Sequence, residues 1–310
     1  SAAVRVSRAY THREVIAVCG YHGWQDWFIG STTRDKGVPR STKALTKSFK
    51  FNDIDSLRNL ISKHQNQIAA VIMEPMNSTY PQQEFLPEVR KLCDENGIVL
   101  IFDETITGFR FSKGGAQEYF NVIPDLSTFG KGVANGFPLS VIAGKREIMM
   151  EMEEIFFSGT FGGELLSLAA AKTVLDLHLR SKVVPKLREI GEDLQNRTNL
   201  AISETNTTEL LSLSGHPTWA FLNWTGSEGY SSEFLKTYFM QEMFQQGVLI
   251  LGTHNINLAH GVKNLNQIEA SFIWYDLDRF YLKLCRPHSL SVIVFVANNL
   301  LYPLKLWHPH

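Results

Sequence analysis

The sequence has few cysteines and almost no net charge. Its three cysteines, Cys19, Cys93 and Cys285, are widely spaced along 310 residues, and none of them forms a CxxC pair. An odd, scattered set argues against a disulfide framework and against a structural zinc site, and it predicts a reducing compartment such as the cytoplasm. The formal net charge of −1 leaves no basic surplus. It therefore argues against nucleic acid or an anionic membrane surface as a partner.

Long apolar runs are also missing. The run at 291–301 (SVIVFVANNLL) is interrupted by two asparagines and is shorter than the roughly 20 residues of a membrane-spanning helix. We therefore expect no membrane span, although a β-prone run of this kind is an aggregation hazard when exposed. No apolar signal sequence opens the chain. Residues 1–10 instead resemble the interior of a helix, so we expect a preceding segment to be missing.

Apolar runs alternate with segments of helical spacing over the first 180 residues. The runs typical of buried strands are residues 14–20, 68–73, 97–102 and 139–143, and helical spacing is found at residues 52–61, 85–96 and 164–179. Strands that alternate with helices predict an α/β fold with a mainly parallel sheet covered by helices on both faces.

The composition changes near Arg180–Pro185. We expect a helix at 186–204, a turn-rich stretch at 206–217, a strand at 218–223, a helix at 231–246 and a strand at 248–251. This is the size of a small α/β lobe. The sequence therefore predicts a large domain over residues 1–183 and a small domain over residues 184–265.

Two polar motifs follow apolar runs and stand 28 residues apart. Asp103 and Glu104 come directly after the strand at 97–102, and Lys131 lies between Gly130 and Gly132 after another short apolar run. A buried carboxylate and a buried lysine at strand ends suit pyridoxal phosphate: the lysine forms a Schiff base and the carboxylate pairs with the protonated pyridine nitrogen. Each motif alone also fits a plainer interpretation, a surface lysine in a turn or a solvated loop acid.

Together these motifs resemble the class III aminotransferases, fold type I enzymes that use pyridoxal phosphate, and most of all the branch that contains glutamate-1-semialdehyde aminomutase. The resemblance covers roughly residues 1–262 and implies a mainly parallel sheet of the seven-stranded type plus a small C-terminal α/β domain. The matching segments are residues 3–11, 21–23, 71–75, 103–110, 124–126, 130–132 and 158–160.

The resemblance implies roles for several residues at the cofactor ring. Lys131 would form the Schiff base and then move the proton on the substrate carbon. Asp103 would pair with the pyridinium nitrogen, while Glu104 would be structural, since adjacent side chains at a strand end point to opposite sides. Tyr21 would stack on the ring, with Thr105 near its other face. A core tyrosine is the plainer alternative for Tyr21.

Four further residues follow from the resemblance with their alternatives open. Glu74 would shape the site or only order its loop, and His22 would support that region or contact the cofactor. Asn77 could reach the ring oxygen, although its spacing departs from the common family pattern. Thr160 would bind the cofactor phosphate from a neighbouring subunit, which implies a homodimer with a shared active site; the alternative is a plain turn before a helix.

The sequence also departs from the family. The phosphate-binding loop that precedes the first helix and the segment that lines the substrate entrance are absent, so we expect weak cofactor retention. The likeness fades after about residue 265, and we treat residues 266–310 as an atypical tail, the result of a shifted reading frame in our hypothesis.

Three functions remain open at this point. The first is a transaminase that moves an amino group from a small-molecule donor to a carbonyl acceptor. The second is an intramolecular amino transfer of the aminomutase type, which uses the same residues. The third is an inactive truncated copy. The missing entrance segment would distinguish the first two.

Overall fold

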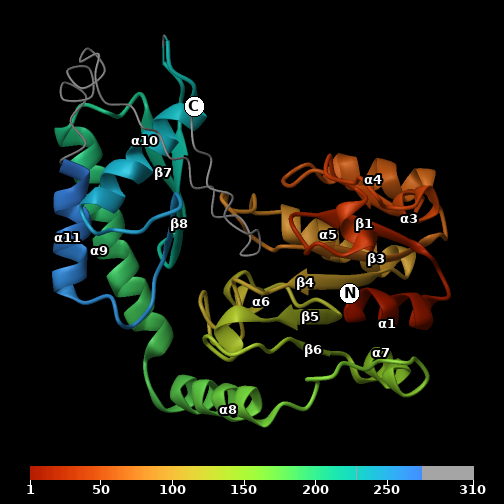
Figure 1. Ribbon diagram of the computed structural model, residues 1–310. Coiled ribbons are helices and arrows are strands. Elements are labelled where there is room, and N and C mark those ends of the chain that lie inside the picture. The colour runs from red at the N-terminus through yellow and green to blue at the C-terminus, as the bar shows by residue number, and fades with distance from the viewer. Residues whose placement is uncertain (228, 274–310) are drawn as a thin grey trace, which may run out of the picture.

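The computed structural model describes residues 1–227 and 229–273. The described chain contains two sheets, a large one formed before residue 150 and a small one formed after residue 210. Figure 1 shows them in two separate parts of the molecule, with helix α8 (Leu165–Arg180) leading from the large sheet to α9 (Val183–Glu204) beside the small one. The prediction of an α/β fold is confirmed.

The large sheet has six strands in the order β2-β1-β3-β4-β5-β6. The first five are parallel and β6 is antiparallel to β5. The resemblance implied a sheet of the seven-stranded type, whereas the sheet among the described residues has six strands. The strands are β1 (Val15–Cys19), β2 (Thr46–Ser48), β3 (Ile68–Met73), β4 (Val99–Asp103), β5 (Leu126–Phe129) and β6 (Val141–Gly144).

Helices cover both faces of this sheet (Figure 1). Successive side chains of a strand point to opposite faces, and β1 shows the consequence. Val15, Ala17 and Cys19 share one core with α4 (Ile54–Lys63) and α5 (Phe85–Asn96). Ile16 and Val18 belong to a second core with α1 (Ala2–Thr11) and α7 (Arg146–Met149). A strand buried on both faces needs the continuous apolar runs seen in the sequence.

Local signals set the ends of these helices. The Asp53 carboxylate accepts a hydrogen bond from the Ser56 backbone N–H at 2.9 Å and so caps the start of α4. Gly97 ends α5 in the left-handed conformation, with φ of 59°. The shorter helices are α2 (Asp26–Ile29), α3 (Arg40–Ala44), α6 (Ala116–Tyr119), η1 (Lys131–Val133) and η2 (Met150–Glu153).

The small sheet is antiparallel in the order β7-β8-β9. Its strands are β7 (Leu211–His216), β8 (Trp219–Trp224) and β9 (Thr253–Asn255), and the flanking helices are α9, α10 (Ser232–Gln245) and α11 (Val262–Ile273). α11 lies beside α9, where the Arg197 guanidinium contacts the Glu269 carboxylate at 2.7 Å.

Two of our predictions for this region were wrong. Residues 206–217 are not only turns, because Leu211 to His216 pair along the whole length of β8. Ser212 and Ser214 stand at alternate positions, which fits the two-residue period of a strand. The strand expected at 248–251 is absent from the described residues. Ile250 packs into the core without ladder bonds, and β9 forms instead at Thr253, where the backbone meets β8.

Part of the expected tail lies outside the described residues. α11 ends at Ile273, so the apolar run at 291–301 has no structural description here. Among residues 1–227 and 229–273, no helix combines the length and apolarity that crossing a membrane requires.

Gly191 in α9 gives a test of the packing between this helix and the small sheet. A Cβ built there would lie 2.2 Å from the Pro217 carbonyl oxygen, a backbone atom. Gly191→Ala should therefore lower the free energy of unfolding by about 1–3 kcal/mol, although alanine in an open helix site would raise it by roughly 1 kcal/mol. Denaturant unfolding measures the sign. Gly163→Ala, where a Cβ meets nothing within 4 Å, is the control, and equal stabilisation of both variants would contradict this packing.

Candidate functional site

Four of the five predicted site residues lie at or just beyond the carboxyl ends of adjacent parallel strands. Tyr21 follows β1, Glu74 follows β3, Asp103 ends β4 and Lys131 follows β5. Because these strands are parallel neighbours, their carboxyl ends share one edge of the sheet, which is where open α/β sheets bind ligands. The topology thus brings together residues that are up to 110 positions apart in the sequence.

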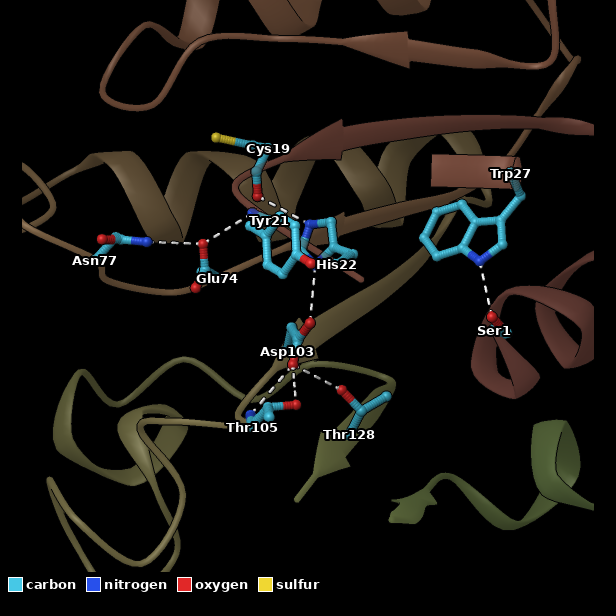
Figure 2. Close-up of polar contacts among 10 residues, drawn as sticks. All are labelled: Ser1, Cys19, Tyr21, His22, Trp27, Glu74, Asn77, Asp103, Thr105 and Thr128. Carbon is cyan, nitrogen blue, oxygen red and sulfur yellow. Dashed lines mark hydrogen bonds and ion pairs between the residues drawn. The ribbon is translucent and has the colours of Figure 1, made fainter. Parts of the chain in front are cut away.

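The Asp103 carboxylate is the most heavily bonded group at this edge (Figure 2). Its Oδ2 lies 2.8 Å from Nδ1 of His22. Its Oδ1 accepts hydrogen bonds from the Thr105 hydroxyl at 2.5 Å and the Thr128 hydroxyl at 3.1 Å. Burial alone would raise the pKa of Asp103, but the hydrogen bond and charge of His22, together with Thr105, bring the pKa below its ordinary value. The site therefore holds an ionised carboxylate.

His22 is a buried partner of this carboxylate. The side chain is buried, and its Nε2 lies 3.1 Å from the Cys19 carbonyl oxygen. The imidazole stacks on Trp27 with ring centroids 6.4 Å apart and meets the edge of Phe28 at 5.2 Å. Of the two alternatives left open by the sequence, the described contacts are those of a residue that orients Asp103.

Glu104 points away from the edge, as expected for the neighbour of Asp103 in a strand. Its carboxylate accepts hydrogen bonds from the backbone N–H groups of Ala116 at 2.7 Å and Gln117 at 2.8 Å, and from the Thr107 hydroxyl. These bonds tie the turn after β4 to the start of α6. Gly115 is required beside it, because a Cβ there would lie 2.6 Å from the carboxylate.

Glu74 joins two turns of the site edge. Its Oε2 accepts hydrogen bonds from the Tyr21 backbone N–H and from Nδ2 of Asn77, both at 2.9 Å (Figure 2). Burial raises the pKa of Glu74, and the nearby charge of Asp103 adds to the shift, against the lowering effect of the two donors. The Asn77 amide, which the resemblance linked to a ring oxygen, is engaged by this carboxylate in the structure. Gly20 cannot carry a side chain here, since a Cβ would lie 2.5 Å from Oε2 of Glu74.

Tyr21 and Lys131 present accessible groups. The Tyr21 side chain is 62% exposed and meets the edge of Phe28 at 5.6 Å. Lys131 is exposed, so the expectation of a buried lysine was wrong: the chain leaves the sheet at Phe129, and the lysine lies in the turn beyond it. Its backbone has φ of 41°, a left-handed conformation that costs a non-glycine residue about 1–2 kcal/mol. Such strain is concentrated at functional sites.

Thr160 is the one of the five predicted residues that does not lie at a strand end of this edge. It lies in the exposed segment between η2 and α8. The sequence also did not indicate that Thr128 donates a hydrogen bond to Asp103. Its position opposite Asp103 in the β4–β5 register is a property of strand pairing, and no local motif announces it.

Comparison with known proteins gives consistent results. The family described as Aminotransferase class-III matches residues 2–263. A glutamate-1-semialdehyde 2,1-aminomutase of Methanococcoides burtonii is 39% identical over 220 residues, covering 65% of this chain and 52% of that protein. Another of that name, from Syntrophobacter fumaroxidans, is 34% identical over 301 residues, covering 87% of this chain and 69% of that protein. The chain spans about half the length of the first curated relatives it matches.

Solved structures agree on the fold. The FumI protein of a Sphingopyxis species, in its PLP internal aldimine form, superposes with a TM-score of 0.82 at 24% identity and covers 92% of this chain and 70% of that one. An omega-transaminase from Sphaerobacter thermophilus gives a TM-score of 0.78 at 24% identity, covering 88% of this chain and 70% of that one. At this identity the likeness establishes fold type I, as the sequence predicted.

The raised pKa of Glu74 predicts a pH dependence of stability. Above its ordinary value of 4.5, the unfolded carboxyl has lost its proton while the folded one still holds it. The parent chain therefore loses stability as the pH rises through the folded pKa. Glu74→Gln removes this loss, so its free energy of unfolding relative to the parent should rise above pH 4.5 by up to about 1.4 kcal/mol per pH unit. Urea unfolding at several pH values measures the difference; a constant difference would contradict the assignment.

Proposed function

The chain belongs to the class-III aminotransferase family, and from this we propose that it moves an amino group from a small-molecule donor to a carbonyl acceptor with pyridoxal phosphate held at Lys131. One observation carries the proposal: an ionised, largely buried carboxylate at Asp103 shares a sheet edge with the strained backbone at Lys131. Because the chain spans about half of its first relatives, the activity of the whole protein belongs to the proposal as well.

The residues of this edge fit the proposed cofactor. When bound, pyridoxal phosphate supplies an electron sink for the carbanion of the substrate, provided that its pyridine nitrogen carries a proton. A carboxylate that stays ionised favours that proton, and His22 and Thr105 keep Asp103 in this state. Glu74 is less suited to the same role, because burial raises its pKa and so favours the neutral, protonated carboxyl.

Lys131 and Tyr21 supply the remaining parts at the ring. The exposed Lys131 Nζ is accessible for a covalent link to the cofactor aldehyde. Once released, the same amine can take a proton from the substrate carbon and return it. Tyr21 has an open ring face, which we assign to stacking on the cofactor, and Glu74 fixes the turn that carries it through the Tyr21 N–H.

We assign the cofactor phosphate to Thr160 of a second subunit. A hydroxyl in a glycine-rich turn before a helix suits a phosphate, and Thr160 precedes Gly162, Gly163 and α8. Because Thr160 lies in an exposed segment outside the edge of strand ends, we assign its meeting with Asp103 and Lys131 to a partner subunit. The active unit is then a homodimer.

The surface around Thr160 supports this assembly. α8 packs on its own chain through a narrow stripe made by Ser167, Ala171 and His178, while its leucines face outward. Leu165 is 77% exposed and Leu179 75%, and Phe161 beside the helix is 77% exposed. A helix that buries small residues and exposes its leucines reverses the usual arrangement, and an apolar surface of this extent marks a protein interface.

An intramolecular amino transfer of the aminomutase type is the second candidate. The observation that favours it is the name of the curated relatives at 34–40% identity. The two reactions use the residues discussed above. They differ in whether the intermediate that carries two amino groups leaves the site. Incubation with an amino donor, followed by assay for a released keto acid, separates them.

We also propose a cytoplasmic location. Cys19 and Cys93 are buried free thiols in the described part of the chain, which agrees with a reducing compartment.

The cofactor assignment is tested by absorbance and borohydride reduction. The parent chain with added pyridoxal phosphate should show a near-ultraviolet to visible band that borohydride converts into a covalent adduct on Lys131. Lys131→Ala should lose the adduct completely because no other amine occupies this turn. Lys113→Ala, a change at an exposed lysine of another loop, should keep it. Mass spectrometry locates the adduct, and an adduct on another residue would overturn the assignment.

The homodimer is tested at α8. Leu165→Glu places a charge in the proposed interface and should raise the dimer dissociation constant at least about tenfold, which corresponds to roughly 1.4 kcal/mol. Leu249→Glu alters an equally exposed leucine in the region of the small sheet and should leave association unchanged. Analytical ultracentrifugation measures both. A parent chain that sediments as a monomer at all concentrations would contradict the proposal.

A further inference from the structure

The turn that follows Asp103 is firmly fixed to the site edge. The Gly108 N–H donates to the Glu104 carbonyl at 2.9 Å, and the Phe111 N–H donates to the Thr107 carbonyl at 3.2 Å. The Thr107 hydroxyl also donates to the Glu104 carboxylate. Space is tight as well, because a Cβ on Gly108 would lie 2.6 Å from the Phe129 ring. These contacts join the turn to Glu104, the residue that directly follows β4.

Arg110 extends from this turn to the small sheet. Its Nη1 donates to the Thr218 carbonyl at 2.8 Å and to the Ile256 carbonyl at 2.9 Å. Thr218 lies just before β8 and Ile256 just after β9, and the Ile256 N–H itself donates to the Thr218 carbonyl at 3.2 Å. One guanidinium therefore holds together the corner where two strands of the small sheet meet.

The Arg110 contact places a charged group against the small sheet, which is unusual for a contact that only packs two parts of a protein together. Burial lowers the pKa of Arg110. Among the residues that the structure describes, no carboxylate forms an ion pair with Arg110. A buried charge without a counter-ion is expensive unless it makes hydrogen bonds. Both hydrogen bonds come from Nη1, whose two N–H groups lie in the guanidinium plane and can each meet one carbonyl.

The side chains on either side of Arg110 reach different parts of the structure. Phe109 has φ of 60°, an unfavourable conformation for an aromatic residue, and packs against Phe129 of β5 at 5.5 Å. Phe111 is fully buried and stacks on His216 of β7 at 3.9 Å with an interplanar angle of 19°. Consecutive residues thus contact the large sheet, the β8–β9 corner and β7.

We propose that Arg110 is a positioning residue that couples the small sheet to the turn that follows Asp103. A shift of the β8–β9 corner then changes the turn at 104–111 and, through it, the orientation of the Asp103 carboxylate. The importance of this coupling for catalysis rests on the proposed function of Asp103. The coupling itself is a property of the chain without cofactor and is measurable there.

Amide hydrogen exchange on the 310-residue chain tests the coupling. Arg110→Met removes the guanidinium group and keeps most of the side-chain volume. It should speed exchange about fivefold or more, the lower range of coupling between sites, at Ile256 and also at Gly108, Ala116 and Gln117 across the interface. Arg197→Met removes a comparable arginine contact, between α9 and α11. It should speed exchange only in the small sheet and the helices that flank it. Faster exchange at Ile256 alone would overturn the proposal.

A reciprocal variant keeps the test decisive if Arg110→Met fails to fold. Thr107→Val removes the hydroxyl that donates to Glu104 and leaves Arg110 unchanged. Coupling is reciprocal, so exchange at Ile256 should again rise about fivefold or more. Unchanged exchange at Ile256 would refute the coupling. A chain that shows the coupling but forms no borohydride adduct would instead refute the proposed function alone.

Discussion

The interaction between Asp103 and His22 is the constraint on which the rest of the site depends. A carboxylate removed from water loses its charge unless donors surround it, and here an imidazole and two hydroxyls do so. The donors come from the turn after β1, from the turn after β4 and from β5. Holding one charge therefore also holds three strand ends in a fixed relation, and Glu74 adds the fourth through the Tyr21 N–H.

The site is asymmetric in a way that agrees with an incomplete cofactor cradle in one chain. Asp103, His22 and Glu74 are largely buried and fully bonded, whereas Tyr21, Lys131 and Thr160 are exposed. The part of the site that would meet the pyridine nitrogen is therefore already formed within one chain. The half that would meet the phosphate and the substrate is open, next to an apolar surface suited to a second subunit.

The sequence predicted the large sheet well because its strands are buried on both faces. The runs at 68–73 and 85–96 match β3 and α5 to the residue, since continuous apolar character, helical spacing and a terminal glycine are local signals. The small sheet was predicted less well. β7 carries serines and a glycine, and its identity as a strand depends on pairing with β8, which is a tertiary effect.

The site shows the same division. Family motifs located Asp103, Lys131, Tyr21 and Glu74 at strand ends, but they did not indicate that Lys131 is exposed or that Thr128 binds Asp103. Strand register and side-chain direction decide both features. The two carbonyls that receive Arg110 lie 108 and 146 residues away in the sequence, so no local pattern could have revealed that contact.

The central claim is that Asp103, kept ionised by His22, holds a protonated pyridine ring. The most direct measurement is the ¹⁵N chemical shift of ring-labelled pyridoxal phosphate bound to the chain, compared with the same complex of Asp103→Asn. We expect a protonated ring nitrogen with the parent chain and an unprotonated one with the variant at the same pH. An unprotonated ring in the parent, or identical shifts in the two complexes, would contradict it.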